Sequence, residues 1–258
     1  MRTRLHDLFK KGQKQLLSVY YTAGFPTLND TGRVAKALAD AGADIIEIGI
    51  PFSDPVADGP TIQHSSKVAL DNGMTLSLLL NQVKELRKSV SIPIILMGYI
   101  NPVMQYGLEK FAADASSAGV DGLILPDLPI PEYEAEYCAT FEKAGLPVTF
   151  LISPTTSPER ISEIDRLSST FIYAVSASST TGARNGFSSD QIDYFKKLKS
   201  LKLKSPVMIG FGISDKSTFQ EASSYGAGAI VGSAFISLLK ESKDLESDIS
   251  RFVTGLKS

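Results

Sequence analysis

Three carboxylates lie close together in residues 45–60, IIEIGIPFSDPVADGP, and they sit in two different settings. Glu47 lies within an apolar run whose alternating side chains are typical of a β-strand. A buried charged carboxylate is costly, so Glu47 needs either a cationic partner or a function that uses a raised pKa. Asp54 and Asp58 follow in a loop rich in proline. These three acids are suited to general acid–base catalysis.

Each of these acids also has a purely structural interpretation. Glu47 could form an ion pair with a cation from another strand, although the strand cores predicted below contain no lysine or arginine. Asp54 and Asp58 could cap a helix or stabilise a turn. Asp58 comes just before Pro60, a residue favoured in the first turn of a helix, so capping could be its whole role. Sequence position alone does not separate these readings.

The elements that must position these acids alternate regularly along the chain. Apolar runs predict strands at 16–21, 45–50, 94–97, 122–125, 148–152, 171–175, 207–209 and 229–231. Helical patterns occupy 3–11, 30–41, 61–71, 75–88, 107–118, 131–144, 158–167, 189–199, 215–225 and the remainder. Eight such strand–helix units predict an α/β fold, a closed (β/α)8 TIM barrel with additional helices. No linker interrupts residues 1–258, which favours a single domain.

In such a barrel the carboxyl ends of the strands carry the site. If Ile46, Ile48 and Ile50 face the surrounding helices, alternation turns Glu47 toward the barrel interior, near this end.

Glycine-rich turns follow the last two predicted strands. Gly210 and Gly212 come after the first of them, and Gly232 and Ser233 come after the second. Barrels of this class bind phosphate at this place, because glycines let backbone N–H groups approach the anion and a helix N-terminus adds partial positive charge. The alternative is that each glycine only permits a tight turn. Both turns together favour phosphate binding.

The loop at residues 176–186, SASSTTGARNG, is long, small and polar. It could act as a lid that excludes water, with Thr181 and Gly182 near the phosphate, or it could be an ordinary surface loop.

Several aromatic and aliphatic residues fall near strand ends. Tyr99 and Tyr173 could orient a carboxyl group or simply pack, which is the commoner role. An apolar pocket for a flat aromatic substrate, or equally the barrel core, could include Tyr20, Met97, Ile124, Ile152 and Phe211.

The composition limits which classes of protein and which partners remain possible. The 258 residues carry 26 basic and 28 acidic side chains, a net charge of −2, which does not favour nucleic acid or an anionic membrane as partner. One cysteine, Cys138, excludes an internal disulfide and suits the reducing cytoplasm. Two histidines, His6 and His64, do not make a familiar zinc site, and no nucleotide-binding motif occurs. No run predicts a membrane span or a secretory signal.

Four motifs give the chain a marked resemblance to a known family. The segment IEIGIPFSDPVADGPTIQ at 46–63, TTGA at 180–183, GFGIS at 210–214 and VGSA at 231–234 closely resemble the tryptophan synthase alpha chain family, in order and over essentially the whole chain. The resemblance implies a (β/α)8 barrel. It also implies a lyase that cleaves indole-3-glycerol phosphate to indole and glyceraldehyde 3-phosphate by a retro-aldol step.

The resemblance also implies roles for individual residues. Glu47 matches the acid–base glutamate, Asp58 the aspartate that binds the indole N–H, and Tyr173 an auxiliary tyrosine of the site. The phosphate-binding positions match Gly182, Gly212, Gly232 and Ser233, and the substrate-pocket positions match Tyr20, Thr22, Ile124 and Phe211.

Members of this family pair with a beta chain that holds pyridoxal phosphate and receives the indole, so the resemblance implies an α2β2 heterotetramer and no cofactor on this chain. The partner surface would include residues 52–60, 101–105 and 127–131, with Asp54 coupling loop closure to the partner. Ala177 stands where some members have a lid arginine. Two other readings stay open: a free-standing indole-3-glycerol-phosphate lyase, and a non-catalytic activator of a beta chain.

Overall fold

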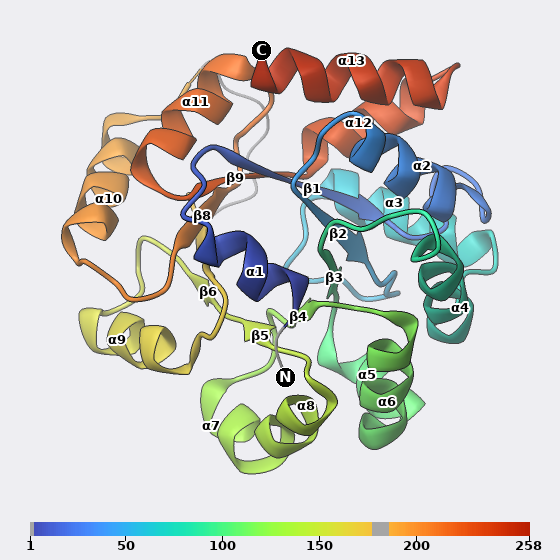
Figure 1. The fold of residues 1–258 in the computed structure, drawn as a ribbon, viewed down its shortest axis with the longest axis horizontal. Helices are drawn as coiled ribbons and strands as arrows, with labels where there is room; N and C mark the ends of the chain where they lie inside the picture. Colours follow the sequence, from blue (N-terminus) through green and yellow to red (C-terminus); the bar gives the residue numbers. More distant parts are fainter. Residues whose placement is uncertain (1–2, 177–185) are drawn as a thin grey trace.

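A barrel of parallel strands forms the centre of the molecule, surrounded by helices (Figure 1). The computed structural model describes residues 3–176 and 186–258. In the sheet the strands follow the order β5-β4-β3-β2-β1-β9-β8-β7-β6. The bounds are β1 Leu16–Thr22, β2 Ile45–Gly49, β3 Ile94–Met97, β4 Gly122–Ile124, β5 Val148–Thr149, β6 Leu151–Ile152, β7 Ile172–Val175, β8 Val207–Gly210 and β9 Gly228–Val231.

The predicted strand at 148–152 is divided at Phe150 into β5 and β6. These two segments are the two ends of the sheet order and also neighbours in sequence, so the barrel closes through them. Counted as one, they make eight barrel strands, which confirms the predicted TIM barrel.

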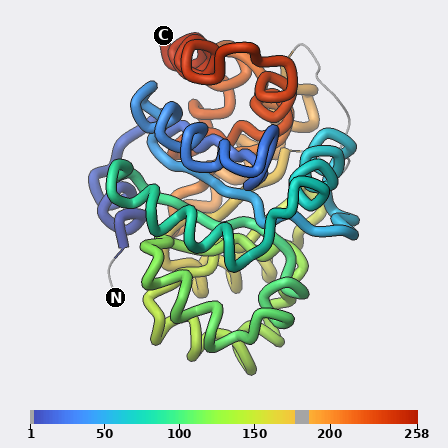
Figure 2. The backbone as a smooth tube through the Cα atoms, turned by 90° about the vertical axis from the view of Figure 1, so that its right-hand side faces the viewer, coloured from blue at the N-terminus to red at the C-terminus, as the bar shows by residue number. Residues whose placement is uncertain are grey.

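Helices cover the outside of the barrel. They are α1 Arg4–Lys10, α2 Asp30–Asp40, α3 Pro60–Asp71, α4 Leu76–Leu86, α5 Ile100–Tyr106, α6 Leu108–Ala118, α7 Ile130–Glu132, the π-helical turn η1 Tyr133–Tyr137, α8 Cys138–Ala144, α9 Pro158–Leu167, α10 Ser189–Ser200, α11 Lys216–Tyr225, α12 Ser233–Glu241 and α13 Leu245–Lys257. The side view shows α13 lying beside α2, which brings the end of the chain next to its first barrel helix (Figure 2). None of the helices in the described ranges combines the length and apolar character that crossing a membrane requires.

Two helical predictions were incomplete. The predicted helices leave out residues 101–105, which are predicted as a loop, and the structure places them in helix α5. Pro102 falls in the first turn, where its missing N–H has no intrahelical role, and Asp127 from the next loop accepts a hydrogen bond from the Ile100 N–H at 2.9 Å. The helix predicted at 131–144 is interrupted by η1.

Alternation along β2 divides its side chains between two apolar clusters. Ile46, Ile48 and Ile50 pack in the large cluster between strands and helices, whereas Ile45 belongs to the smaller cluster inside the barrel. Glu47 follows the parity of Ile45 and therefore faces the interior, as predicted.

Helix α1 closes the amino-terminal end of the barrel, where Leu5 joins the interior cluster (Figure 1). Arg4 donates to Asp121 at 3.1 Å, and Arg87 forms an ion pair with the same buried carboxylate. The site must therefore open at the other end.

Candidate active site

Glu47 is fully buried near the carboxyl end of β2. The Ser18 hydroxyl donates to its Oε1 at 2.6 Å, and Oε2 has no hydrogen-bond partner within the described part of the chain. No lysine or arginine forms an ion pair with Glu47 among residues 3–176 and 186–258. Burial raises the pKa of Glu47 to about 7, against the opposing effect of the Ser18 hydrogen bond. A carboxyl group with this pKa can both donate and accept a proton near neutral pH.

Asp58 lies in the loop between β2 and α3, where Tyr99 holds it. The Tyr99 hydroxyl donates to Asp58 Oδ2 at 3.1 Å and accepts from the Ala57 N–H at 2.9 Å. Gly59 is the N-cap of α3, and no side chain caps that helix, so the capping explanation for Asp58 is wrong. Burial raises the pKa of Asp58, and the Tyr99 hydrogen bond opposes that rise.

Asp54 in the same loop is exposed and accepts a hydrogen bond from its neighbour Ser53. It does not lie with the buried acids.

A narrow hollow with a volume of about 10 Å³ opens at this end of the barrel. Its lining residues are Tyr20, Ile50, Phe52, Asp58, Ser66, Met97, Gly98, Tyr99 and Pro126. Tyr20 on β1 stands beside Glu47 in the strand register, which links the hollow to the buried acid. A Cβ added at Gly49 would lie 2.2 Å from the Tyr20 hydroxyl oxygen, so this glycine makes room for the phenol.

Tyr173 on β7 approaches the same acids from the opposite part of the barrel. Its ring is buried and lies 6.4 Å, centroid to centroid, from the ring of Phe211. Burial, and then the nearby Glu47 carboxylate, raise the pKa of Tyr173 well above its ordinary value. The phenol therefore keeps its proton at neutral pH.

Two predicted pocket residues take internal positions. Ile124, the last residue of β4, belongs to the apolar cluster inside the barrel with Tyr173. Thr22 at the end of β1 is fully buried and lies 2.6 Å from the Ser65 hydroxyl, oxygen to oxygen.

The two glycine turns lie on neighbouring strands. Gly212 has a φ of +77° and follows Phe211, whose carbonyl accepts a hydrogen bond from Ser176 at 2.7 Å. Gly232 is the N-cap of α12 and Ser233 its first residue. Because β8 and β9 pair in parallel, both turns lie at the same rim. An added Cβ at Gly232 would be 3.6 Å from the Tyr20 ring, so this rim adjoins the hollow.

Thr181, Gly182 and Ala177 lie outside the described residues. The sequence motifs do not single out Ser18, although alternation along 16–22 puts it on the face of Tyr20.

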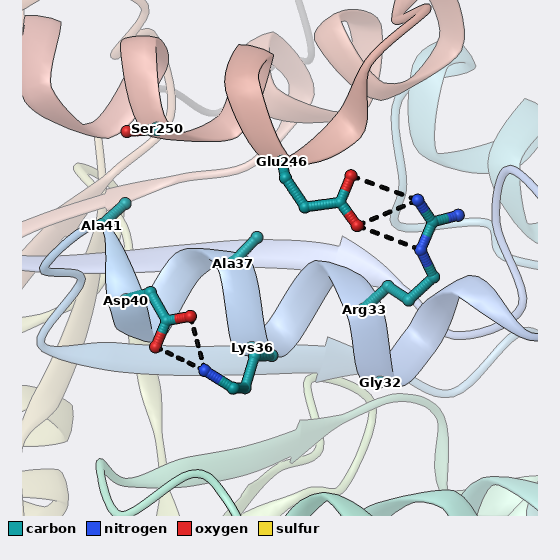
Figure 3. A pocket seen from close by; sticks show the side chains of 8 residues that line it. All are labelled: Gly32, Arg33, Lys36, Ala37, Asp40, Ala41, Glu246 and Ser250. Carbon is teal, nitrogen blue, oxygen red and sulfur yellow. Dashed lines mark hydrogen bonds and ion pairs between the residues drawn. The ribbon is translucent and has the colours of Figure 1, made fainter.

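A second hollow lies outside the barrel, between α2 and α13 (Figure 3). Arg33 pairs with Glu246 at 2.9 Å, and Lys36 pairs with Asp40, so its charges satisfy one another. It lies on helices rather than at the strand ends. Within the described ranges, no group of three His, Cys, Asp or Glu side chains could hold a metal ion.

The fold is a (β/α)8 barrel that carries a buried acid, a second carboxylate and glycine turns at one rim, which is the arrangement of a barrel enzyme. A protein-family model described as tryptophan synthase alpha chain matches residues 6–256. The tryptophan synthase alpha chain of Flavobacterium psychrophilum is 53% identical over 243 residues, which cover 94% of this chain and 95% of the relative. That of Parabacteroides distasonis is 48% identical over 254 residues, covering 98% and 99%.

Solved structures agree. Tryptophan synthase subunit alpha from Legionella pneumophila superposes with a TM-score of 0.90 at 34% identity, covering 100% of this chain and 98% of that chain. A tryptophan synthase structure from M. tuberculosis gives 0.86 at 30% identity, covering 99% and 98%. The chain belongs to the tryptophan synthase alpha chain family. It is a carbon–carbon lyase, the alpha subunit that cleaves indole-3-glycerol phosphate.

Proposed function

We propose that Glu47 is the catalytic acid–base group of this cleavage. Its protonated carboxyl gives a proton to C3 of the indole ring, which leaves a positive indolenine-like ring. The resulting carboxylate then takes the proton of the glycerol hydroxyl next to the ring. As the C–C bond breaks, its electron pair returns to the ring, the hydroxyl carbon becomes the aldehyde of glyceraldehyde 3-phosphate, and Glu47 is protonated again. The pKa of about 7 supports both roles, because each protonation state is populated near neutral pH.

Asp58 stabilises the positive ring through its N–H. Its carboxylate lines the hollow, and Tyr99 occupies Oδ2 with a single hydrogen bond. The second oxygen is therefore the one that we assign to the indole N–H. A carboxylate held at the place where positive charge develops lowers the barrier to protonation of the ring.

Tyr173 acts as an auxiliary group at Glu47. Its phenol keeps its proton and is close enough for the carboxylate to affect its titration. It orients the substrate hydroxyl or the carboxyl group.

The remaining pocket residues bind the indole ring and the hydroxyl groups. Tyr20 and Tyr99 line the hollow, and we assign Ile124 on β4, Thr22 on β1 and Phe211 in the turn after β8 to the same substrate pocket.

The phosphate binds at the rim formed by Gly212, Gly232 and Ser233, together with Thr181 and Gly182. The N-terminus of α12 has no side-chain cap, so its first N–H groups are available to an anion. The distance of 3.6 Å between an added Gly232 Cβ and the Tyr20 ring supports one continuous site for phosphate and indole.

We propose that this chain acts with a beta chain in an α2β2 heterotetramer, in the cytoplasm, and that pyridoxal phosphate is held by the partner. Two large apolar side chains support a partner surface near the hollow: Val56 is 88% exposed and Met104 is 57% exposed. Tyr99 connects the Val56 loop to the start of α5, which carries Met104. Residues 1–258 act as one domain.

The buried Oε2 of Glu47, which has no hydrogen-bond partner among residues 3–176 and 186–258, carries this proposal, and Glu47→Gln tests it. The variant keeps the shape of the side chain and loses the transferable proton, so we expect indole release to fall to the level without enzyme while substrate binding largely survives. Indole is measured from indole-3-glycerol phosphate, and binding by calorimetry on the same sample. Near-normal turnover would contradict the assignment.

A further inference from the structure

Ser18 is buried inside the barrel and its hydroxyl is committed to one atom. On β1, Leu17 and Val19 pack outward against the helices, so Ser18 and Tyr20 face the interior. Ser18 is fully buried, and its Oγ lies 2.6 Å from Oε1 of Glu47, which is also fully buried. A hydroxyl held this way donates its one hydrogen to the carboxyl group.

This hydrogen bond makes the two oxygens of Glu47 different. Oε1 already accepts a hydrogen from Ser18, whereas Oε2 is buried without a partner in the described part of the chain. When Glu47 is protonated, the proton therefore resides on Oε2, because a proton on Oε1 would compete with the Ser18 donor. We infer that Ser18 is a positioning residue: it holds Oε1 and leaves Oε2 as the atom that gives and takes the proton during cleavage.

The inference rests on the proposed role of Glu47 and specifies its geometry. Oε2–H breaks as the proton moves to the ring carbon. Oε2–H forms again when the substrate hydroxyl loses its proton, while the C–C bond breaks and the aldehyde C=O forms. Ser18 keeps its proton throughout and contributes a fixed orientation of the carboxyl plane.

The other groups around Glu47 do not hydrogen-bond to it in the described part of the chain. Besides burial, the carboxylates of Glu47 and Asp58 both raise the pKa of Tyr20 on β1 and of Tyr173 on β7, so these two phenols lie near both acids. The register partner on β3 is the apolar Ile95. Among the described residues, Ser18 is the one side chain that hydrogen-bonds to Glu47.

The effect of this hydrogen bond on the protonation of Glu47 provides a test of the role of Ser18. A donor to a carboxylate favours the ionised form, and here it lowers the pKa of Glu47 against the effect of burial. Because cleavage begins with protonated Glu47, kcat/KM falls as the pH rises through the pKa of this group. Removing the donor should move that fall to higher pH.

The experiment compares the pH dependence of kcat/KM for indole release from indole-3-glycerol phosphate in the full chain and in four variants. The basic limb is the part of the profile in which kcat/KM falls as the pH rises. In Ser18→Ala and Ser18→Cys its midpoint should move up by about one to two pH units, the range expected for loss of a hydrogen bond to a charged group. Ser18→Thr keeps the hydroxyl and should keep the midpoint of the native chain. Thr149→Val is the matched control, since Thr149 is another buried hydroxyl on a barrel strand, 3.4 Å from Thr170 Oγ1.

The outcomes separate the two proposals. An unmoved basic limb in folded Ser18→Ala and Ser18→Cys would overturn the role of Ser18, and so would an equal shift in Thr149→Val. If Ser18→Ala does not fold, Ser18→Cys decides, because a thiol keeps the volume and is a weak donor. Activity in Glu47→Gln would instead overturn the proposed function. If Glu47→Gln is inactive but the basic limb of Ser18→Ala stays at the native pH, the Ser18 inference alone is overturned.

Discussion

Glu47 is an acid whose surroundings disfavour its charge. It is fully buried, it has one hydroxyl donor, and no cation pairs with it in the described residues. Because burial disfavours the carboxylate, Glu47 keeps its proton up to about pH 7. The protonated form is therefore present near neutral pH and can act as an acid. Asp58 is less enclosed and has Tyr99 as a donor, so the two carboxyl groups suit different roles.

The raised pKa predicts how stability depends on pH. The folded pKa of Glu47, about 7, exceeds the ordinary value of 4.5, so between these values the folded state binds more protons than the unfolded state. This group's contribution to the free energy of unfolding therefore falls as the pH rises from 4.5 to 7, by roughly 3 kcal/mol, and stays low above pH 7. We expect Glu47→Gln to be more stable than the native chain at pH 8 and to lose this advantage near pH 4.5.

Urea unfolding of both proteins at several pH values measures this difference. Glu85→Gln, on the exposed end of α4, is the control that should show no such pH trend. A Glu47→Gln chain less stable than the native chain at pH 8 would contradict the assigned burial cost.

Asp58→Asn should lower kcat by about 10²-fold or more, because a neutral amide does not stabilise the positive ring. Asp71→Asn on the surface of α3 changes charge equally and should leave kcat unaltered, since Asp71 pairs with the exposed Lys67 on the same helix. Steady-state indole release from the two variants gives the comparison. Native turnover in Asp58→Asn would mean that the carboxylate does not act on the ring.

At the scale of elements, strand ends supply both the acids and the space around them. Gly49 ends β2 under the Tyr20 phenol, and Gly210 ends β8 under the Tyr173 ring, where an added Cβ would lie 2.3 Å from Cε2. Each of these glycines lets an aromatic ring from a neighbouring strand cover the barrel mouth. The spacing of the site is thus set by backbone positions as much as by functional side chains.

Gly49→Ala should disturb the site without changing any charged group. Its Cβ would lie 2.2 Å from the Tyr20 hydroxyl oxygen, so the phenol must leave its present position in the site. We expect kcat/KM for indole release to fall at least tenfold. Gly32→Ala is the control: nothing lies within 4 Å of its added Cβ, and it sits in α2, so activity should persist and the melting temperature should not fall. Equal activity of the two variants would contradict the packing argument.

At the scale of the whole molecule, the hollow opens beside exposed apolar residues rather than beside the closed end of the barrel. Leu5 and the pairing of Arg4 and Arg87 with Asp121 seal the amino-terminal end. Val56 is exposed in the loop that carries Asp58, and Met104 is exposed on α5, whose N-cap Tyr99 binds that loop. A partner bound there would contact the loop that carries a proposed catalytic residue.

Adding a beta chain should therefore raise indole release by this chain, and Met104→Glu should weaken that stimulation without abolishing the basal rate. Ser250→Glu, on α13, adds the same charge to a surface far from the strand ends and should respond normally. Titrating beta chain into each protein and measuring indole release provides the comparison. A rate unaffected by beta chain would favour the free-standing lyase, and no cleavage even in the complex would favour the non-catalytic activator.

The repeated pattern of the chain determined the barrel, because strands buried on both faces and separated by amphipathic helices have one common way to close. The alternation of side chains along the strand also determined that Glu47 faces the barrel interior, since successive residues of a strand point to opposite faces. The motif at 46–63 identified both acids and the family. Sequence alone left Asp58 between capping and catalysis, and it did not find Ser18, α5 or the break at Phe150. Only the tertiary structure shows that Tyr99 donates to Asp58, that Ser18 donates to Glu47 and that Asp127 accepts from the start of α5, because each of these hydrogen bonds joins residues far apart in the sequence.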